Sequence, residues 1–137
     1  MGSEMCIRDR NSEILLCKRS IEPRSGYWTL PAGFLENGES IEEGALRETQ
    51  EEAKLLVKDV QLFNVISVPR INQIYTFFTG LVVNDDFGPT PESSEVKLFH
   101  INDIPWDDLA FRTVRMTIEL YLKEGVGKAF NLSLIHI

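Results

Sequence analysis

Short apolar runs punctuate the chain and are separated by polar segments rich in Gly, Pro, Asn and Asp. Runs of this kind that contain many β-branched and aromatic residues are typical of strands. The run QIYTFFTGLVV is apolar almost throughout, which predicts a strand that is buried on both faces. The predicted strands span residues 13–19, 27–30, 60–68, 73–83 and 96–100.

The segment after Gly38 predicts the start of a helix. In Ser40-Ile41-Glu42-Glu43, the Ser40 hydroxyl can accept from the Glu43 amide while the Glu43 carboxylate accepts from the Ser40 amide, which is a capping box. Small and apolar residues then recur at four-residue steps and predict a modest buried stripe. They are Ile41, Ala45, Thr49 and Ala53.

A second helix is predicted from Trp106-Asp107-Asp108 to about Glu124, with Gly125 and Gly127 closing it. Its apolar residues recur at helical spacing, so we expect them to pack in the core. Strands interrupted by one helix and followed by another predict an α/β fold in which a mixed sheet lies between helices. The core residues expected from the second helix are Phe111, Val114, Ile118 and Tyr121.

Composition narrows the classes of function. The chain has 137 residues, which is the size of a single domain, and 43% of them are hydrophobic. A net charge of −7 argues against nonspecific binding of nucleic acid, which needs clustered basic residues. No apolar run approaches the ~20 residues of a membrane span. Cys6 and Cys17 indicate neither a disulfide framework nor a zinc site, so we expect a reducing, cytoplasmic setting.

Three carboxylates gather on one face of the first predicted helix. Glu48 stands three residues before Glu51 and four before Glu52, so their side chains can converge. Like charges at this spacing cost an isolated helix about 0.2–0.5 kcal/mol per pair. A solvated acidic face is the simple interpretation. The alternative is Mg²⁺, which typically takes one or two carboxylates and completes its shell with water and substrate phosphate. The apolar strand and Pro/Gly turn at Trp28–Phe34 favour the metal, because a loop there can hold it against a diphosphate.

These residues and their spacing resemble the Nudix box, G-x5-E-x7-R-E-U-x-E-E-x-G-U, in which U is aliphatic. The resemblance implies a Nudix α/β/α sandwich that spans the chain as one domain. The chain departs from the pattern mildly at Thr49 and clearly at Lys54, where the family has glycine. Because that glycine ends the helix in a left-handed conformation, lysine there should cost about 1 kcal/mol. The matching residues are Gly33, Glu39, Arg47, Glu48, Glu51, Glu52 and Leu55.

The Nudix resemblance also implies roles in a hydrolysis in which a metal-activated water attacks one phosphorus. The metal would be Mg²⁺, with Mn²⁺ as the alternative. Glu39 and Arg47 would orient the box by pairing, and Glu52 is the first candidate for activating water. Glu95 matches a position that often supplies a further acid, with Glu92 as the fallback and a solvated loop as the alternative for both. The implied metal ligands are Gly33 through its carbonyl, Glu48, Glu51 and Glu52.

Segments outside the box resemble the subgroup that includes the plant chloroplast FAD and ADP-ribose pyrophosphatase. They are residues 21–34, 86–93 and 103–111, and the resemblance covers roughly residues 12–124. It implies that FAD is cleaved to FMN and AMP, or ADP-ribose to AMP and ribose 5-phosphate. Relatives often carry an N-terminal zinc ribbon, which this sequence does not contain, and they are commonly homodimers. A homodimer is therefore expected.

A few residues are candidates for holding such a dinucleotide. Arg19 and Arg24 would contact phosphate. Trp28 and Phe34 would flank a base or a flavin ring, with core packing as the alternative for both. The aromatic residues of the predicted strand 73–83, Tyr75 and Phe77, are expected in the core.

Two other functions stay open. The first is a nucleoside-triphosphate or capped-RNA hydrolase, against which the subgroup resemblance and the lack of a basic patch weigh. The second is a catalytically inactive module that binds a nucleotide for regulation. Degenerate boxes of that kind usually lose one of the acids that correspond to Glu48, Glu51 and Glu52, and all three are present here.

The two ends of the chain share an unusual relationship. One coding of residues 132–137 has a reverse complement that encodes Met-Cys-Ile-Arg-Asp, which is residues 5–9. Both peptides can therefore be translations of one DNA element, similar to the transposon end used in sequencing libraries. We expect 1–10 and 132–137 to be adapter- or cloning-derived and about 11–128 to be native. Residues 5–10 can nevertheless form a hairpin strand, with a turn at Asn11-Ser12.

Overall fold

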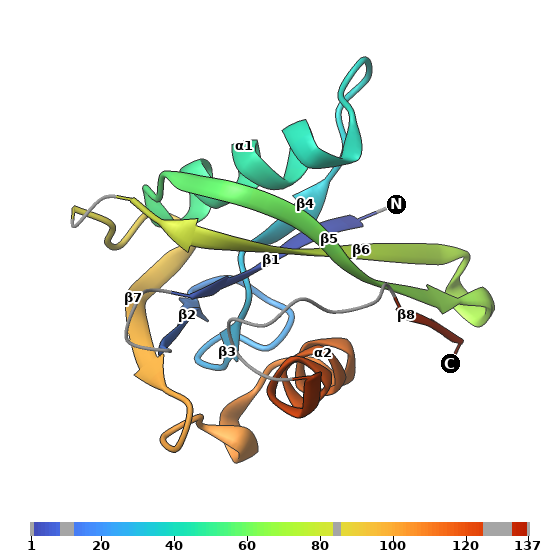
Figure 1. Ribbon diagram of the computed structural model, residues 1–137. Helices are drawn as coiled ribbons and strands as arrows, with labels where there is room; N and C mark the ends of the chain where they lie inside the picture. Colours follow the sequence, from blue (N-terminus) through green and yellow to red (C-terminus); the bar gives the residue numbers. More distant parts are fainter. Residues whose placement is uncertain (1, 9–12, 84–85, 125–132, 137) are drawn as a thin grey trace.

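A computed structural model describes residues 2–8, 13–83, 86–124 and 133–136. Within these ranges the chain forms one eight-stranded sheet (Figure 1). The strands are β1 (Gly2–Arg8), β2 (Glu13–Arg19), β3 (Trp28–Thr29), β4 (Ala32–Phe34), β5 (Val57–Val68), β6 (Gln73–Val82), β7 (Ser93–His100) and β8 (Ser133–His136). Their main order is β3-β2-β1-β6-β5-β8, with β4 added beside β1 and β7 beside β2.

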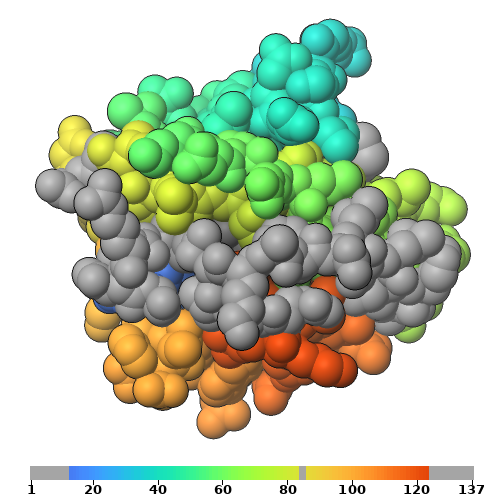
Figure 2. Space-filling model, in the orientation of Figure 1, coloured from blue at the N-terminus to red at the C-terminus, as the bar shows by residue number. Residues whose placement is uncertain are grey.

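The sheet is mixed, as predicted. β1 runs parallel to β6 and β8 runs parallel to β5, whereas the other neighbouring strands are antiparallel. Helix α1 (Ile41–Ala53) lies on one side of the sheet and helix α2 (Arg112–Glu124) on the other (Figure 1). In the same orientation, the space-filling view shows β5 and β6 as a band between the two helices (Figure 2). The predicted α/β/α arrangement is therefore confirmed.

Two hydrophobic clusters fill the spaces between the sheet and the helices. In β2, Leu15 belongs to the cluster beneath α1, and its neighbour Leu16 belongs to the cluster beneath α2. In β6, the adjacent Phe78 and Phe77 divide between the clusters in the same way, and both are fully buried. A strand that is buried on both faces has no polar side, which explains the nearly continuous apolar runs in the sequence.

Helix α1 begins and ends as its sequence predicts. The Glu43 amide donates to the Ser40 hydroxyl at 3.1 Å, and the Ser40 amide donates to the Glu43 carboxylate at 3.0 Å. At the other end, Lys54 adopts the left-handed conformation with φ 56° and ψ 38°, and its amide donates to the Gln50 carbonyl. Because side chains are strained in that conformation, the predicted cost of about 1 kcal/mol applies at Lys54. The buried stripe contains Ala45, Thr49 and Ala53.

The second helix begins later than predicted. Trp106–Asp108 form a 3₁₀ turn, and α2 starts only at Arg112, so Phe111 precedes the helix. Neither α1 nor α2, the two α-helices in the described ranges, combines the length and the apolarity that a membrane-crossing helix requires. The remaining residues of the predicted core stripe are buried, and they are Val114, Ile118 and Tyr121.

Other element boundaries differ from the prediction. β5 begins at Val57, and β7 begins at Ser93, so Glu95 lies within the strand rather than before it. The predicted turn at Ala32–Phe34 is instead strand β4, because pairing with β1 satisfies its backbone groups. The glycines expected to close the second helix lie outside the described residues.

Both segments expected to be adapter-derived have backbone partners in the sheet. β1 pairs antiparallel with β2, which matches the hairpin strand predicted for residues 5–10. The turn predicted at Asn11-Ser12 lies outside the described residues. β8 pairs with β5. The origin of the two segments stays a prediction.

Candidate active site

Strand β4 and helix α1 meet at Gly33. The Glu48 carboxylate lies so close to Gly33 that a Cβ atom at this position would overlap it. Pairing with β1 holds β4 in this place. Glycine is therefore required by the close approach of a side chain, and not by a left-handed backbone. The fold brings together two of the predicted metal ligands.

Arg47 ties the chain after β4 to helix α1. Its Nε and Nη2 atoms donate to the two carboxylate oxygens of Glu39 at 2.7 and 3.0 Å, which is a bidentate pair. Nη2 also donates to the Phe34 carbonyl at 2.9 Å, and Nη1 donates to Glu48 and Glu51. The predicted pairing of Glu39 with Arg47 is thus present. Its hydrogen bonds hold the pKa of Glu39 below the usual range.

Glu48 and Glu52 occupy a less solvated position. Burial raises the pKa of the Glu48 carboxyl, although hydrogen bonding to Arg47 opposes the shift. Burial also raises the pKa of Glu52 to about 8, and the neighbouring charges of Glu48 and Glu92 act in the same direction. The Ala32 amide donates to Glu52 Oε2 at 3.0 Å, which favours the ionised form but does not cancel these effects. Negative charge here is under-compensated, a condition that a bound cation relieves.

Glu92 reaches this cluster because its loop is fastened at two points. The Thr90 hydroxyl donates to the Glu52 carbonyl at 2.9 Å, at the last turn of α1. The Ser20 amide donates to the Glu92 carbonyl at 3.0 Å. The Glu92 carboxyl then lies within hydrogen-bonding reach of the Glu52 carboxyl. Sequence spacing alone does not place these two acids together.

Glu95 lies elsewhere. It is exposed on β7, where its backbone pairs with Lys18 of β2. Within the described ranges, no hydrogen bond or ion pair joins Glu95 to Glu48 or Glu52. The geometry therefore favours the fallback, Glu92, over Glu95 as the additional acid.

The predicted metal ligands do not form a closed cage. The Glu51 side chain is 59% exposed and paired with Arg47. Across the part of the chain that the structure describes, no three acidic, histidine or cysteine side chains converge on one point. Mg²⁺ needs no such cage, because it takes one or two carboxylates and keeps several waters. Glu48 beside Gly33, and Glu52 beside the Ala32 amide, are oxygen donors suited to a hard divalent cation.

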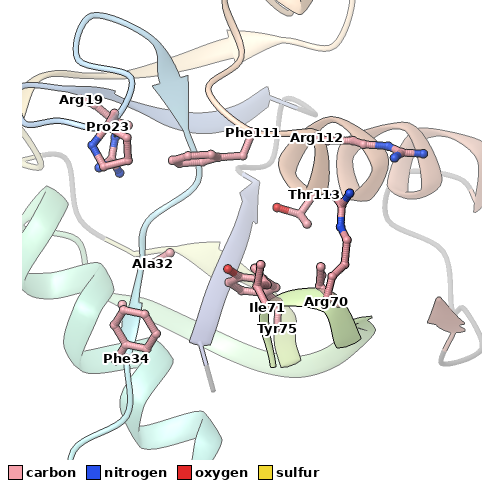
Figure 3. Close-up of a pocket in the computed structure, with 12 residues that line it drawn as sticks. Arg19, Pro23, Ala32, Phe34, Arg70, Ile71, Tyr75, Phe111, Arg112 and Thr113 are labelled. Carbon is pink, nitrogen blue, oxygen red and sulfur yellow. The ribbon is translucent and has the colours of Figure 1, made fainter. Parts of the chain in front are cut away.

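A cavity of about 550 Å³ opens beside β4 (Figure 3). Its volume is in the range of small-molecule and cofactor sites. Figure 3 shows Phe34 and Ala32 on one side of the cavity. Phe111, just before α2, and Thr113, in its first turn, lie on another. Among its described lining residues there are three arginines, three aromatic residues and no acid. The arginines are Arg19, Arg70 and Arg112, and the aromatic residues are Phe34, Tyr75 and Phe111.

Of the four predicted substrate contacts, the structure brings Arg19 and Phe34 to this cavity. Trp28 is only 9% exposed and belongs to the core cluster beneath α2, so the core-packing alternative describes it. The Arg24 guanidinium lies over the Tyr27 ring, 4.1 Å from its centroid, outside the cavity wall.

The sequence-based prediction missed most of the cavity wall. Tyr75 and Phe77 were both expected in the core, and Phe77 is fully buried. Tyr75 is only half-buried and lines the cavity. Arg70 follows strand β5, and Arg112 is the first residue of α2. The hydrophobic periodicity of the sequence does not indicate where an arginine at such a position points. The one available signal was that both are basic residues in an acidic chain.

The fold and the box geometry define a class of protein that the comparisons confirm. The NUDIX domain family model matches residues 4–118, so the chain belongs to the Nudix family. The chain is 34% identical over 103 residues to an ADP-ribose pyrophosphatase from Methanocaldococcus jannaschii, covering 72% of this chain and 61% of that protein. It is 31% identical over 121 residues to NAD-capped RNA hydrolase NudC from Pseudomonas syringae pv. tomato, covering 86% of this chain and 42% of that protein. The chain thus spans less than two thirds of the length of these relatives.

Solved structures agree with the fold. A NUDIX hydrolase from Nitrosomonas europaea superposes with a TM-score of 0.90 at 42% identity, covering 99% of this chain and 78% of that chain. An ADP-ribose pyrophosphatase from Streptococcus suis superposes with a TM-score of 0.79 at 19% identity, covering 97% and 96% of the two chains. At that identity the second comparison supports the fold alone.

Proposed function

We propose that this protein hydrolyses a nucleoside diphosphate linked to another moiety, such as ADP-ribose or FAD, and releases AMP in a reaction that requires a divalent metal. The observation that carries the proposal is the position of Glu48 against Gly33 and of Glu52 on the Ala32 amide, because Ala32 and Gly33 line a cavity with arginines and aromatic rings. Carboxylates suit a metal, whereas arginines and rings suit phosphates and a nucleoside. The similarity to an ADP-ribose pyrophosphatase supports the same class of substrate.

The proposed mechanism assigns the metal to the carboxylates of α1 and the adjacent backbone of β4. Glu48, Glu51 and Glu52, with the Gly33 carbonyl, would hold Mg²⁺ or Mn²⁺. When bound, the metal would polarise a phosphate oxygen and lower the pKa of a coordinated water. Glu52 or the adjacent Glu92 would accept the proton from the attacking water.

Arg47 would act by positioning. It binds both oxygens of Glu39 and the carbonyl of Phe34, and so fixes β4 relative to the carboxylates on α1. The cavity would receive the nucleoside or the second moiety of the substrate, with Arg19 and the ring of Phe34 among the contacts. Orientation of the diphosphate and electrostatic stabilisation would then supply most of the rate.

The experiment is a measurement of AMP release from ADP-ribose, FAD, NADH and a nucleoside triphosphate, each with Mg²⁺, Mn²⁺ or a chelator. We expect metal-dependent AMP release from ADP-ribose or FAD. Glu52→Gln should lower kcat by about 10²–10⁴-fold if this group transfers the proton. Glu42→Gln is the matched control, because Glu42 is exposed on the first turn of the same helix and should leave the rate unchanged. Turnover in the chelator, or a Glu52→Gln variant as active as the control, would contradict the mechanism.

The two candidates for the additional acid can be separated in the same assay. The contacts of Glu92 predict that Glu92→Gln lowers kcat more than Glu95→Gln does. The reverse order would restore Glu95 to the role that the family resemblance implied.

A second candidate function is hydrolysis of an NAD cap on RNA, favoured by the similarity to NudC proteins. The NAD cap and ADP-ribose contain the same kind of diphosphate linkage. An assay in which NAD-capped RNA and free ADP-ribose compete for the enzyme therefore distinguishes the two candidate functions. A non-catalytic nucleotide-binding module would bind ADP-ribose without turnover under any metal condition. The proposed assembly is a homodimer, which light scattering on the full chain tests.

A further inference from the structure

The cavity has a charge opposite to that of the whole chain. The protein has a net charge of −7, but the described lining residues of the cavity include three arginines and no aspartate or glutamate. A wall of this composition in an acidic protein favours an anionic ligand. The diphosphate of the proposed substrate is one such anionic group, and it would lie at the end of the cavity beside Gly33.

Two of the three cavity arginines lack partners. Arg19 donates from Nε to the Pro23 carbonyl at 2.7 Å and lies over the Phe111 ring. In contrast, Arg70 and Arg112 make no hydrogen bond, ion pair or ring contact with any residue that the structure describes. Three other arginines have side chains that the structure describes, and all three have such partners: Arg24, Arg47 and Arg115. The unpartnered arginines therefore coincide with the cavity wall.

These two arginines come from the side of the cavity opposite Ala32 and Phe34 of β4. Arg70 belongs to the 3₁₀ turn after β5, and Arg112 is the first residue of α2. Figure 3 shows Arg70 extending toward the start of α2, and Arg112 leaving that start with its side chain directed along the helix. Ala32 and Phe34 of β4 lie on the other side of the cavity. A substrate whose diphosphate lies at β4 would thus present its far end to Arg70 and Arg112.

We propose that Arg70 and Arg112 bind a phosphate monoester on the part of the substrate that fills the cavity, in addition to the diphosphate that is hydrolysed. This inference rests on the proposed function and narrows its substrate class to nucleotides with an extra 2′- or 3′-phosphate. Guanidinium groups suit such a dianion, because their planar forks form paired, charge-assisted hydrogen bonds with phosphate oxygens. ADP-ribose and FAD have no group of this kind.

The first test compares substrates that differ by one phosphate. Hydrolysis of ADP-ribose 2′-phosphate should exceed that of ADP-ribose by about tenfold or more in kcat/KM, the gain that a charge-assisted hydrogen bond supports. Arg70→Gln and Arg112→Gln should each reduce this ratio while changing the rate with ADP-ribose much less. Arg115→Gln is the matched control, because Arg115 is on the same helix, pairs with Glu119 and does not line the cavity. Equal kcat/KM for the two substrates in the unmodified protein would overturn the inference.

The second test measures binding without turnover. Adenosine 2′,5′-bisphosphate, adenosine 3′,5′-bisphosphate and AMP contain no diphosphate linkage, so calorimetry with them reports on the phosphate monoester alone. One of the two bisphosphates should bind at least about tenfold more tightly than AMP, and Arg70→Gln should remove that difference. The preferred bisphosphate identifies the 2′ or the 3′ position.

The outcomes separate this inference from the proposed function. Selective binding of a bisphosphate without any hydrolysis would support the arginine site and contradict the hydrolase proposal. Hydrolysis with no preference for the extra phosphate, or a preference that survives in both arginine variants, would overturn the arginine site alone.

Discussion

The two ends of the cavity are built in different ways. At the carboxylate end, Gly33 lines the cavity and Glu48 packs against Gly33. This end comes mainly from residues 33–52, in which the spacing of acids on a helix determines that Glu48 and Glu52 lie on one face. The arginine end combines the turn after β5 with the start of α2, which are more than forty residues apart in the chain, with Arg70 and Arg112 as the basic residues. The comparison teaches that a local motif reveals the reaction centre, whereas the part that selects the substrate depends on how distant segments fold together.

The two ends also differ in charge. At the carboxylate end, burial raises the pKa values of Glu48 and Glu52, and repulsion from neighbouring carboxylates acts in the same direction. At the other end, Arg70 and Arg112 have no carboxylate partner within the described ranges. Each end is therefore suited to a ligand of the opposite charge, a cation at one and an anion at the other. Four variants test this contrast, from the largest expected effect to the smallest.

The largest effect should come from pH in the metal-free protein. Because the pKa of folded Glu52 is raised from the model-compound value of 4.5 to about 8, the folded state binds its proton more tightly than the unfolded state does. The contribution of Glu52 to the free energy of unfolding is thus present below pH 4.5 and is lost as the pH rises to about 8. Glu52→Gln should remove this decline, which amounts to about 2–5 kcal/mol over that window.

Denaturant unfolding at several pH values, with a chelator present, measures this difference. The unmodified protein and Glu52→Gln share all other titrating groups. Subtracting their two curves of unfolding free energy against pH therefore isolates the contribution of Glu52. Arg70→Gln is the control, because an arginine does not titrate in this range and the decline should remain. Parallel curves for Glu52→Gln and the unmodified protein would show that Glu52 is not strained by burial.

Gly33→Ala should be the next most damaging change. The new Cβ atom would overlap the Glu48 carboxylate, which must move away or push β4 from its place. We expect a loss of about 1–3 kcal/mol in the free energy of unfolding, together with a lower kcat. Gly88→Ala is the control, because open space surrounds Gly88 and the change should stay within about 0.5 kcal/mol. Equal effects of the two alanines would argue against the close contact.

Lys54→Gly should stabilise the protein. Lys54 has a φ of 56°, and glycine adopts this left-handed conformation without the strain that a Cβ causes. The expected gain is about 1 kcal/mol in the free energy of unfolding, with kcat unchanged. Lys58→Gly in β5 should have the opposite sign, since glycine weakens a strand by about 0.5–1 kcal/mol. Destabilisation by both glycines would contradict the helix end seen here.

Phe34→Ala should give the smallest effect and should act on KM. The Phe34 ring is 64% exposed at the cavity, so its removal costs little stability and loses a partial contact with substrate. We expect KM to rise about two- to fivefold with kcat nearly unchanged, as befits a contact worth less than a fully buried ring. Ile74→Ala removes another exposed apolar side chain that does not line the cavity, and it should leave KM unchanged. A fall in kcat with constant KM would place Phe34 in the reaction centre instead.

Predictions based on local spacing agree best with the structure. The capping box at Ser40 is present, because it depends on residues three positions apart. The pairing of Glu39 with Arg47, which the family resemblance implied, is also present. The apolar runs of β2 and β6 also become strands, since burial on both faces requires apolar residues throughout.

Predictions agree less well with the structure where the outcome depends on contacts between residues far apart in the sequence. Strand β4 was expected to be a turn, because its Pro/Gly composition does not reveal the pairing with β1. Glu95 was placed ahead of Glu92, although the bonds of Thr90 and Ser20 direct the Glu92 loop to the carboxylate cluster. Tyr75 packs against the core cluster as expected, but it also lines the cavity, which the prediction did not include.

The sequence by itself determined the mixed sheet between helices and the position of the acids on α1, because helix and strand periods are properties of neighbouring residues. The family followed from the resemblance of the residues in the box. Only the tertiary structure decided that Glu48 rests on Gly33, that Glu92 joins Glu52, and that Arg70 and Arg112 line the same cavity as Gly33. Those contacts join segments that are far apart in the sequence, and no periodic pattern of residues predicts which of them meet. They arise from strand pairing and from the packing of two helices on opposite faces of one sheet.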